Sequence, residues 1–134
     1  DGDTLRVGNV AIIAQLTSGH TRGSTSFVTR IVDDGTSYTV VFPTSTGINP
    51  GTRFLDQPSY PGIADDYRRT LQVLEGLTPD IWLFPHNEAY GFAAKRARVA
   101  TEGAHAWVDP AGYREWVAAQ RSRFEAEIAA ETAR

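Results

Sequence analysis

Two histidines of this sequence stand where metal chemistry is possible. His20 lies in the glycine-flanked stretch L-T-S-G-H-T-R-G-S-T-S-F, residues 16–27, directly after an apolar run. His86 directly follows another short apolar segment, residues 80–84. Neutral imidazoles are good zinc ligands, and flanking glycines let a backbone turn sharply. The wide spacing of the two is no metal-binding signature, so a hydrogen-bonded surface role stays open for each.

The remaining residues able to do chemistry favour structural roles. His105 lies in an ordinary connecting segment, and we expect it at the surface. Asp65 and Asp66 fall in the first turn of an expected helix, where acidic groups favour the helix dipole. Arg68 and Arg69 follow them and are expected on a solvated helix face. The chain has no cysteine, which excludes disulfides, thiolate zinc sites and cysteine nucleophiles.

Composition narrows the class of protein. The 134 residues have the size of one domain, and 41% hydrophobic content argues against disorder. A net charge of -3 and the lack of a basic run argue against a nucleic-acid partner. No apolar stretch approaches the roughly 20 residues that span a bilayer. The polar opening without methionine predicts no signal peptide in this sequence and suggests processing or truncation.

The first third of the chain predicts strands. Short alternating or apolar runs cover residues 4–7, 10–16, 24–32 and 37–42. The run Val10–Leu16 is continuously apolar, which is typical of a strand buried on both faces. Asp34-Gly35 between two alternating runs predicts a hairpin. Residues 43–61 hold four prolines and predict a long loop, and long loops in compact domains are often functional.

Helices dominate the second half. Ile63, Tyr67, Leu71 and Leu74 follow helical spacing up to Gly76. A short strand over 80–84 and a helix over 87–99 follow, and Asp109-Pro110 predicts the N-cap and first turn of a terminal helix. This order favours an α/β arrangement with helices packed on a sheet. Because strand ends of such folds hold ligand-binding groups, we expect His20 and His86 at neighbouring strand ends.

Several segments together resemble one known family. They are Gly2–Leu5, Leu16–Phe27, Ser45–Gly51, Tyr60-Pro61, Asp66–Arg69 and Asp80–His86. The combination is similar to the second half of the metallo-β-lactamase fold, in its third subclass of zinc β-lactamases, and covers nearly the whole chain. The resemblance implies half of a four-layer αββα sandwich, with one mixed sheet and its covering helices. Residues 1–134 would form a single C-terminal half-domain, with the N-terminal half absent.

The resemblance also implies roles for single residues. His20 matches the histidine that completes a three-histidine zinc site, and His86 matches a ligand of the second zinc ion. Ser45 stands where glyoxalase II and lactonases have a bridging aspartate, and in this subclass it supports the attacking water. Ser45, Thr46, Gly47 and Asn49 would border the substrate carboxylate, although the subclass often has serine at position 47. Ser18 and Arg22 replace common prolines.

The implied activity is zinc-dependent hydrolysis of the β-lactam amide, with one or two Zn²⁺ per complete enzyme, antibiotic resistance, and a periplasmic or secreted location. The family motif H-x-H-x-D-H, which supplies most metal ligands, does not occur in this sequence. The isolated chain is therefore expected to be inactive. Its expected partner is an N-terminal half carrying that motif, or a second copy of itself. A lactonase or thioesterase of the same fold, and a non-catalytic self-associating half-domain, remain the alternatives.

Overall fold

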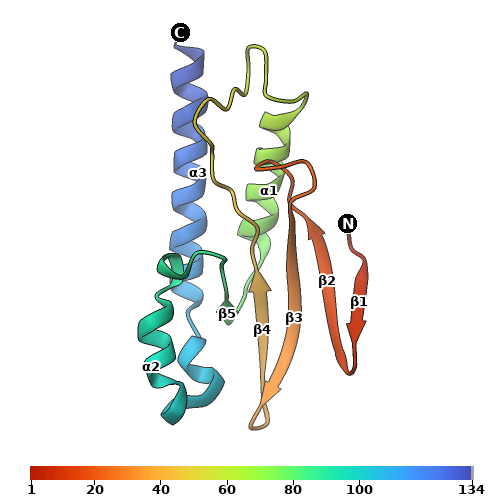
Figure 1. The fold of residues 1–134 in the computed structure, drawn as a ribbon, viewed down its shortest axis with the longest axis vertical. Helices are drawn as coiled ribbons and strands as arrows, with labels where there is room; N and C mark the ends of the chain where they lie inside the picture. Colours follow the sequence, from red (N-terminus) through yellow and green to blue (C-terminus); the bar gives the residue numbers. More distant parts are fainter. Residues whose placement is uncertain (134) are drawn as a thin grey trace.

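Five strands form one mixed sheet in the order β1-β2-β3-β4-β5 in the computed structural model, which describes residues 1–133 (Figure 1). The first four strands pair antiparallel, and β5 pairs parallel with β4. The elements are β1 (Thr4–Val7), β2 (Val10–Leu16), β3 (Thr25–Asp33), β4 (Thr36–Phe42), α1 (Ile63–Gly76), β5 (Ile81–Trp82), the 3₁₀ helix η1 (Asn87–Tyr90), α2 (Phe92–Glu102), the 3₁₀ helix η2 (Gly103–Trp107) and α3 (Pro110–Thr132). The predicted mixed sheet with covering helices is confirmed.

Local signals set the turn and the helix start that the sequence predicts. Asp34 and Gly35 join β3 to β4 with φ values of 45° and 76°, the left-handed conformation that such a two-residue turn requires. The Asp109 side chain accepts a hydrogen bond from the Gly112 backbone N–H at 3.0 Å, which caps α3, and Pro110 occupies its first turn.

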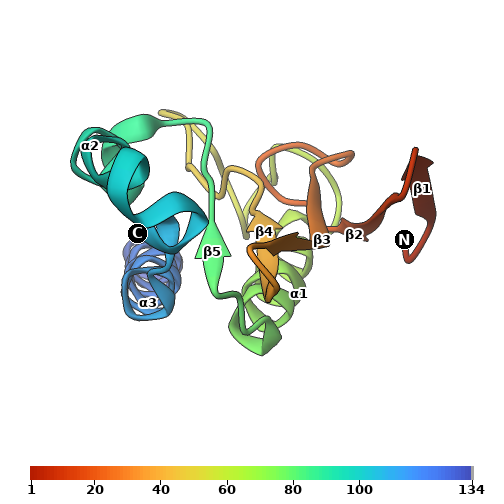
Figure 2. The same ribbon diagram turned by 90° about the horizontal axis from the view of Figure 1, so that it is seen from below.

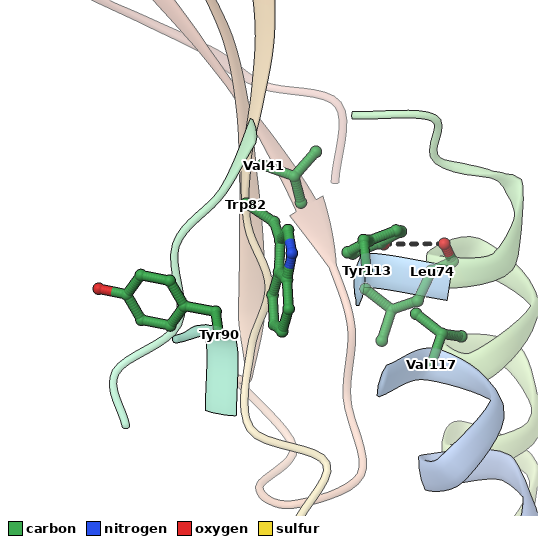
Figure 3. Close-up of a cluster of buried hydrophobic side chains, with 6 residues drawn as sticks. All are labelled: Val41, Leu74, Trp82, Tyr90, Tyr113 and Val117. Carbon is green, nitrogen blue, oxygen red and sulfur yellow. Dashed lines mark hydrogen bonds between the residues drawn. The ribbon is translucent and has the colours of Figure 1, made fainter. Parts of the chain in front are cut away.

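Helices α1 and α3 cover one face of the sheet (Figure 2). The main core consists of Val41, Leu74, Trp82, Tyr90, Tyr113 and Val117, and Tyr90 lies on the side of Trp82 away from these two helices (Figure 3). The Tyr113 hydroxyl donates to the Leu74 carbonyl at 2.8 Å, which joins α3 to α1. A second cluster under residues 43–61 packs Phe54 and Phe124 around Tyr67.

A buried ion pair joins α2 to the start of α3. The Lys95 ammonium lies 2.7 Å from the Asp109 carboxylate, and the Lys95 side chain is only 9% exposed. The ammonium also lies 5.6 Å from the ring centroids of Trp82 and Tyr90. The Trp82 indole N–H donates to Asp109 at 3.4 Å. Because Trp82 belongs to β5, these contacts hold β5 against α2 and the start of α3. The segment that carries His86 follows β5.

The opposite face of the sheet is partly bare. Strand register places Leu5, Val7, Leu16 and Phe42 on the same face as Val40. These four side chains are 53%, 68%, 40% and 38% exposed, respectively. η2 and the residues around it cover only the part of this face near Val40 and Ile81. We call the uncovered part the open face, defined by Leu5, Val7, Leu16 and Phe42.

Three expectations about single elements are wrong. Val10–Leu16 forms a strand, but it is not buried on both faces, because α1 and α3 do not extend over β2 and the open face is bare. The helix expected over 87–99 is interrupted at Gly91, whose φ of 67° ends η1 before α2 begins. The strand expected over 80–84 is shorter, Ile81–Trp82.

No helix within residues 1–133 combines the length and apolarity needed to cross a membrane.

Candidate metal centre at the sheet edge

The sheet topology gathers the predicted residues at one edge. β2 and β4 both run antiparallel to β3, and β5 runs parallel to β4, so β2, β4 and β5 end at the same edge. His20 lies in the loop after β2, Ser45 in the loop after β4, and His86 in the segment after β5 (Figure 1). Three segments distant in sequence therefore lie at the edge where an α/β sheet holds its ligands.

A buried serine ties two of these loops together. The Ser26 hydroxyl lies 2.9 Å from the Thr17 hydroxyl and accepts a hydrogen bond from the Thr44 backbone N–H, also at 2.9 Å. Ser26 and Thr17 are fully buried. Because Thr17 begins the loop of His20 and Thr44 begins the loop of Ser45, the spacing of the two loops is fixed from within the sheet.

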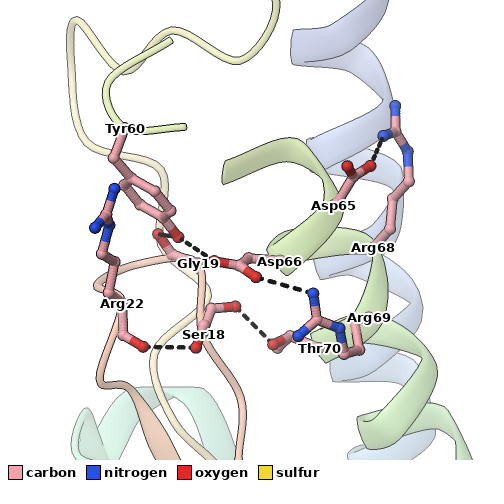
Figure 4. Close-up of polar contacts among 9 residues, drawn as sticks. All are labelled: Ser18, Gly19, Arg22, Tyr60, Asp65, Asp66, Arg68, Arg69 and Thr70. Carbon is pink, nitrogen blue, oxygen red and sulfur yellow. Dashed lines mark hydrogen bonds and ion pairs between the residues drawn. The ribbon is translucent and has the colours of Figure 1, made fainter. Parts of the chain in front are cut away.

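Polar contacts shape the loop that carries His20 (Figure 4). The Ser18 hydroxyl donates to the Arg22 carbonyl at 2.6 Å, and the Thr70 hydroxyl of α1 donates to the Ser18 carbonyl at 2.6 Å. The Tyr60 hydroxyl oxygen lies 3.3 Å from the Gly19 carbonyl oxygen, while the Arg22 guanidinium stacks over the Tyr60 ring at 4.9 Å. A serine at position 18 thus supplies a hydrogen bond that closes the loop, which a proline would lack.

The His20 ring has one nitrogen committed to the protein. Its Nδ1 lies 2.6 Å from the Gly47 carbonyl oxygen. A carbonyl only accepts, so Nδ1 must carry the proton, and the neutral ring then presents the lone pair of Nε2. Metal-binding histidines are oriented in this way, with the other ring N–H donated to a backbone carbonyl or carboxylate. The local structure of His20 therefore fits a zinc ligand.

The second predicted zinc ligand, His86, is held by fewer contacts than His20. His86 is exposed, and its ring centroid lies 5.5 Å from that of Phe84. Its backbone carbonyl accepts from the Ala89 N–H at 3.0 Å, which starts η1. An exposed imidazole at the sheet edge can serve a metal ion, although the contacts that orient it are fewer than those of His20.

Within residues 45–49, Ser45 and Gly47 lie beside His20, whereas Thr46 contacts α3. The Ser45 hydroxyl accepts from the Gly47 N–H at 3.2 Å, and a side chain at Gly47 would come within 3.2 Å of that hydroxyl and 3.9 Å of the His20 ring. Ser45, Gly47 and His20 are therefore neighbours. Thr46 is buried, and its hydroxyl donates to Gln120 of α3 at 3.0 Å. Asn49 is exposed at the loop surface.

Within residues 1–133, no three histidine, cysteine, aspartate or glutamate side chains lie close enough together to hold one metal ion. A catalytic zinc ion normally has three protein ligands. The described chain thus offers individual ligands rather than a complete centre.

Comparison with solved structures identifies this architecture, while no protein-family model matches the sequence. The metallo-β-lactamase FEZ-1 from Legionella gormanii superposes with a TM-score of 0.91 at 32% identity, over 98% of this chain and 50% of that one. BJP-1 from Bradyrhizobium japonicum, a subclass B3 metallo-β-lactamase, gives 0.88 at 31% identity, over 99% and 50%. MEM-A1, a subclass B3 enzyme from a soil metagenome library, gives 0.86 at 28%, over 99% and 51%.

The chain has the fold of one half, the C-terminal half, of the subclass B3 metallo-β-lactamases that it resembles. It spans about half the length of the structures that it matches. The resemblance seen in the sequence and the half-sandwich fold are therefore confirmed.

The other residues singled out in the sequence take the structural roles expected of them. His105 is exposed. Asp65 pairs with Arg68 at 2.8 Å, and Asp66 pairs with Arg69 at 3.1 Å, all within α1 (Figure 4). Asp66 also accepts from the Tyr60 hydroxyl at 3.1 Å. Burial and the neighbouring Asp66 carboxylate raise the pKa of Tyr60, so this hydroxyl stays protonated and able to donate.

Sequence reasoning missed one residue beside the candidate site. Tyr67 was expected only on the apolar face of α1, yet its hydroxyl donates to the Gly47 carbonyl at 2.9 Å. Burial raises the pKa of Tyr67 to about 12, which keeps the hydroxyl a donor at neutral pH. The helical spacing of Tyr67 predicts its burial, and nothing local in the sequence points to residue 47.

Proposed function

We propose that this chain forms part of a zinc-dependent β-lactam hydrolase, in which His20 and His86 each supply one ligand to a different zinc ion. The observation that carries the proposal is the hydrogen bond from His20 Nδ1 to Gly47, which leaves Nε2 free. Support also comes from the solved structures that the chain resembles, which are named as metallo-β-lactamases. Bound zinc ions would supply Lewis acidity and an activated water.

The chain's own residues would orient the reactants. A serine hydroxyl can accept and donate at once, so Ser45 can accept from Gly47 and still offer its own proton to the attacking water. Asn49, exposed on the same loop, and the backbone of residues 45–47 would border the substrate carboxylate. The Thr46 hydroxyl, held by Gln120, would instead keep the loop on α3.

A partner is required to complete the centre. The proposed partner is the N-terminal half of the same fold, carrying H-x-H-x-D-H, packed on the open face formed by Leu5, Val7, Leu16 and Phe42. Exposed apolar patches of this kind mark interfaces. A second copy of the chain is the competing occupant. The isolated chain would be inactive, and the complete protein would act in the periplasm or outside the cell.

Co-expression with an N-terminal half carrying the histidine motif tests the proposal. We expect a one-to-one complex that binds zinc and hydrolyses a β-lactam such as nitrocefin. His20→Ala should abolish hydrolysis and lower the zinc content, whereas His105→Ala, which removes another imidazole outside the site, should change neither. A complex loaded with zinc that hydrolyses lactones or thioesters but no β-lactam would contradict the proposal. Formation of homodimers alone, without zinc, would favour the non-catalytic alternative.

A further inference from the structure

The Gly47 carbonyl accepts two hydrogen bonds from side chains far away in sequence. One comes from His20 Nδ1 at 2.6 Å and the other from the Tyr67 hydroxyl at 2.9 Å. A carbonyl oxygen has two lone pairs, so both donors fit. The direction of this carbonyl decides where Nδ1 must point, and therefore where Nε2 of the same ring points.

Tyr67 is itself held firmly. It is 2% exposed, and its ring stacks on Phe124 of α3 with centroids 5.4 Å apart and an interplanar angle of 4°. Phe54 meets it edge-on, at 5.2 Å and 86°. An aromatic ring packed on two sides has few conformations, so the Tyr67 hydroxyl presents a fixed donor to Gly47.

The same ring also supports the backbone before His20. Gly19 has a φ of 146°, and a Cβ atom placed there would lie 2.9 to 3.1 Å from three carbons of the Tyr67 ring. Glycine is therefore needed at position 19 both for its φ and for this close approach. Tyr67 thus borders His20 twice, through Gly19 on its backbone side and through Gly47 on its ring side.

We infer that Tyr67 is a positioning residue for His20: it fixes the Gly47 carbonyl, and with it the tautomer and direction of the imidazole. This inference rests on the proposed function for its consequence, which is zinc affinity. The geometry that it invokes consists of contacts among the chain's own residues. Residues that orient a metal ligand in this way typically change metal affinity or activity by roughly 10–100-fold when mutated. Because Tyr67 acts on His20 only through Gly47, we expect its loss to change zinc affinity by about 10-fold, the lower end of this range.

Tyr67→Phe is the test, with Tyr113→Phe as its matched control. Tyr113 is also a buried tyrosine whose hydroxyl donates to a backbone carbonyl, at 2.8 Å, but to Leu74 rather than at the site. The first readout is the pair of ¹⁵N shifts of the His20 ring in the metal-free protein as purified. Wild type and Tyr113→Phe should show well-separated shifts of a single Nδ1–H tautomer, and Tyr67→Phe should move them toward each other.

The second readout is the zinc dissociation constant of the complex with the N-terminal half. It should rise about 10-fold in Tyr67→Phe and stay within about twofold of wild type in Tyr113→Phe. Unchanged shifts and affinity in Tyr67→Phe, or equal changes in both variants, would overturn the inference. If even the wild-type complex binds no zinc, the proposed function fails, while the nitrogen shifts still decide whether Tyr67 positions His20.

Discussion

The two faces of the sheet differ in how completely this chain covers them. Val41 and Phe42 are neighbours on β4, yet Val41 is fully buried under α1 and α3, while Phe42 is 38% exposed on the open face. The strands thus carry two apolar faces, because successive side chains point to opposite sides. Within residues 1–133, α1 and α3 bury the face of Val41 along β4, whereas η2 covers the opposite face only near Val40 and Ile81.

This difference separates stability from function. The covered face holds the core, so the chain's own free energy of unfolding depends mainly on it. The open face contributes little to the free energy of unfolding of the chain alone, and under the proposed function it is the surface that receives the N-terminal half. Substitutions on the covered face should therefore lower the free energy of unfolding of the chain. Substitutions on the open face should instead weaken its binding to the N-terminal half.

The largest effect is expected at the centre of the covered face. Trp82 is 1% exposed and contacts Tyr90, Tyr113 and Trp116. Trp82→Ala removes a large buried side chain and leaves a cavity, so it should lower the free energy of unfolding by about 3–5 kcal/mol. Urea denaturation followed by circular dichroism measures this. Phe42→Ala, the open-face comparison, should cost less in the chain alone, and equal losses in the two variants would break the distinction.

The next effect is expected at the ion pair of Lys95 with Asp109, which joins α2 to the start of α3 beside Trp82. Lys95→Met removes the ammonium and leaves the Asp109 carboxylate, 30% exposed, without its cation. Loss of one partner of a buried pair is costly, and the partial exposure of Asp109 reduces the cost to about 2–3 kcal/mol. The free energy of unfolding at neutral pH is the measurement. Glu102→Gln, which removes the charge from the more exposed pair of Arg98 with Glu102, is the control and should cost under about 1 kcal/mol.

The same pair predicts a pH dependence of known sign. Burial alone would raise the pKa of Asp109, but hydrogen bonds from Lys95, Gly112 and Trp82 and the charge of Lys95 together hold it below its ordinary value of 3.8. A lowered pKa stabilises the fold above 3.8, and this contribution disappears as the pH falls through the lower value reached in the fold. Asp109→Asn should therefore flatten the fall of stability in acid. An unchanged acid profile would contradict this.

A smaller effect is expected where one hydroxyl is removed from the core. Tyr113→Phe keeps the ring and leaves the buried Leu74 carbonyl without this donor, which should cost about 1–2 kcal/mol. Tyr38→Phe makes the same change on the opposite side of the sheet and is the comparison. Thermal unfolding of both, measured at one pH, shows whether the hydroxyl on the covered face contributes more. A larger loss in Tyr38→Phe would contradict the assignment.

The sequence predicted those features that depend on neighbouring residues. The turn at Asp34-Gly35 and the cap at Asp109 follow from local conformational preferences, and both are found. The burial of β2 was wrong because the same apolar run serves either for a covered strand or for one that awaits a partner. The apolar pattern of a segment shows that the segment can be buried. It does not show which element or partner covers it.

The candidate site shows the same limit. Strand ends in the sequence predicted where His20 and His86 lie, because topology brings those ends to one edge. The hydrogen bonds of Thr46 to Gln120 and of Tyr67 to Gly47 join residues 74 and 20 positions apart, and no local pattern encodes them. Such contacts determine which groups of residues 45–49 are free to bind a ligand. They can be found only in the structure.

The smallest effect on stability, and the sharpest test of the two faces, is expected from two exposed valines. Val7 on the open face is 68% exposed, and Val32 on the opposite side of the sheet is 72% exposed. Val7→Lys and Val32→Lys should each change the free energy of unfolding of the chain by no more than about 0.5 kcal/mol, because both side chains already contact water.

Assembly should separate these two variants. A lysine at Val7 would place a charge inside the proposed contact with the N-terminal half, where its desolvation is costly, whereas a lysine at Val32 would stay in water. Titration calorimetry of each variant against the N-terminal half should show weakened binding for Val7→Lys alone. Equal binding by both would remove the open face as the interface. Weakening by Val7→Lys without any change in unfolding would mean that this half uses one face of its sheet to fold and the other to become complete.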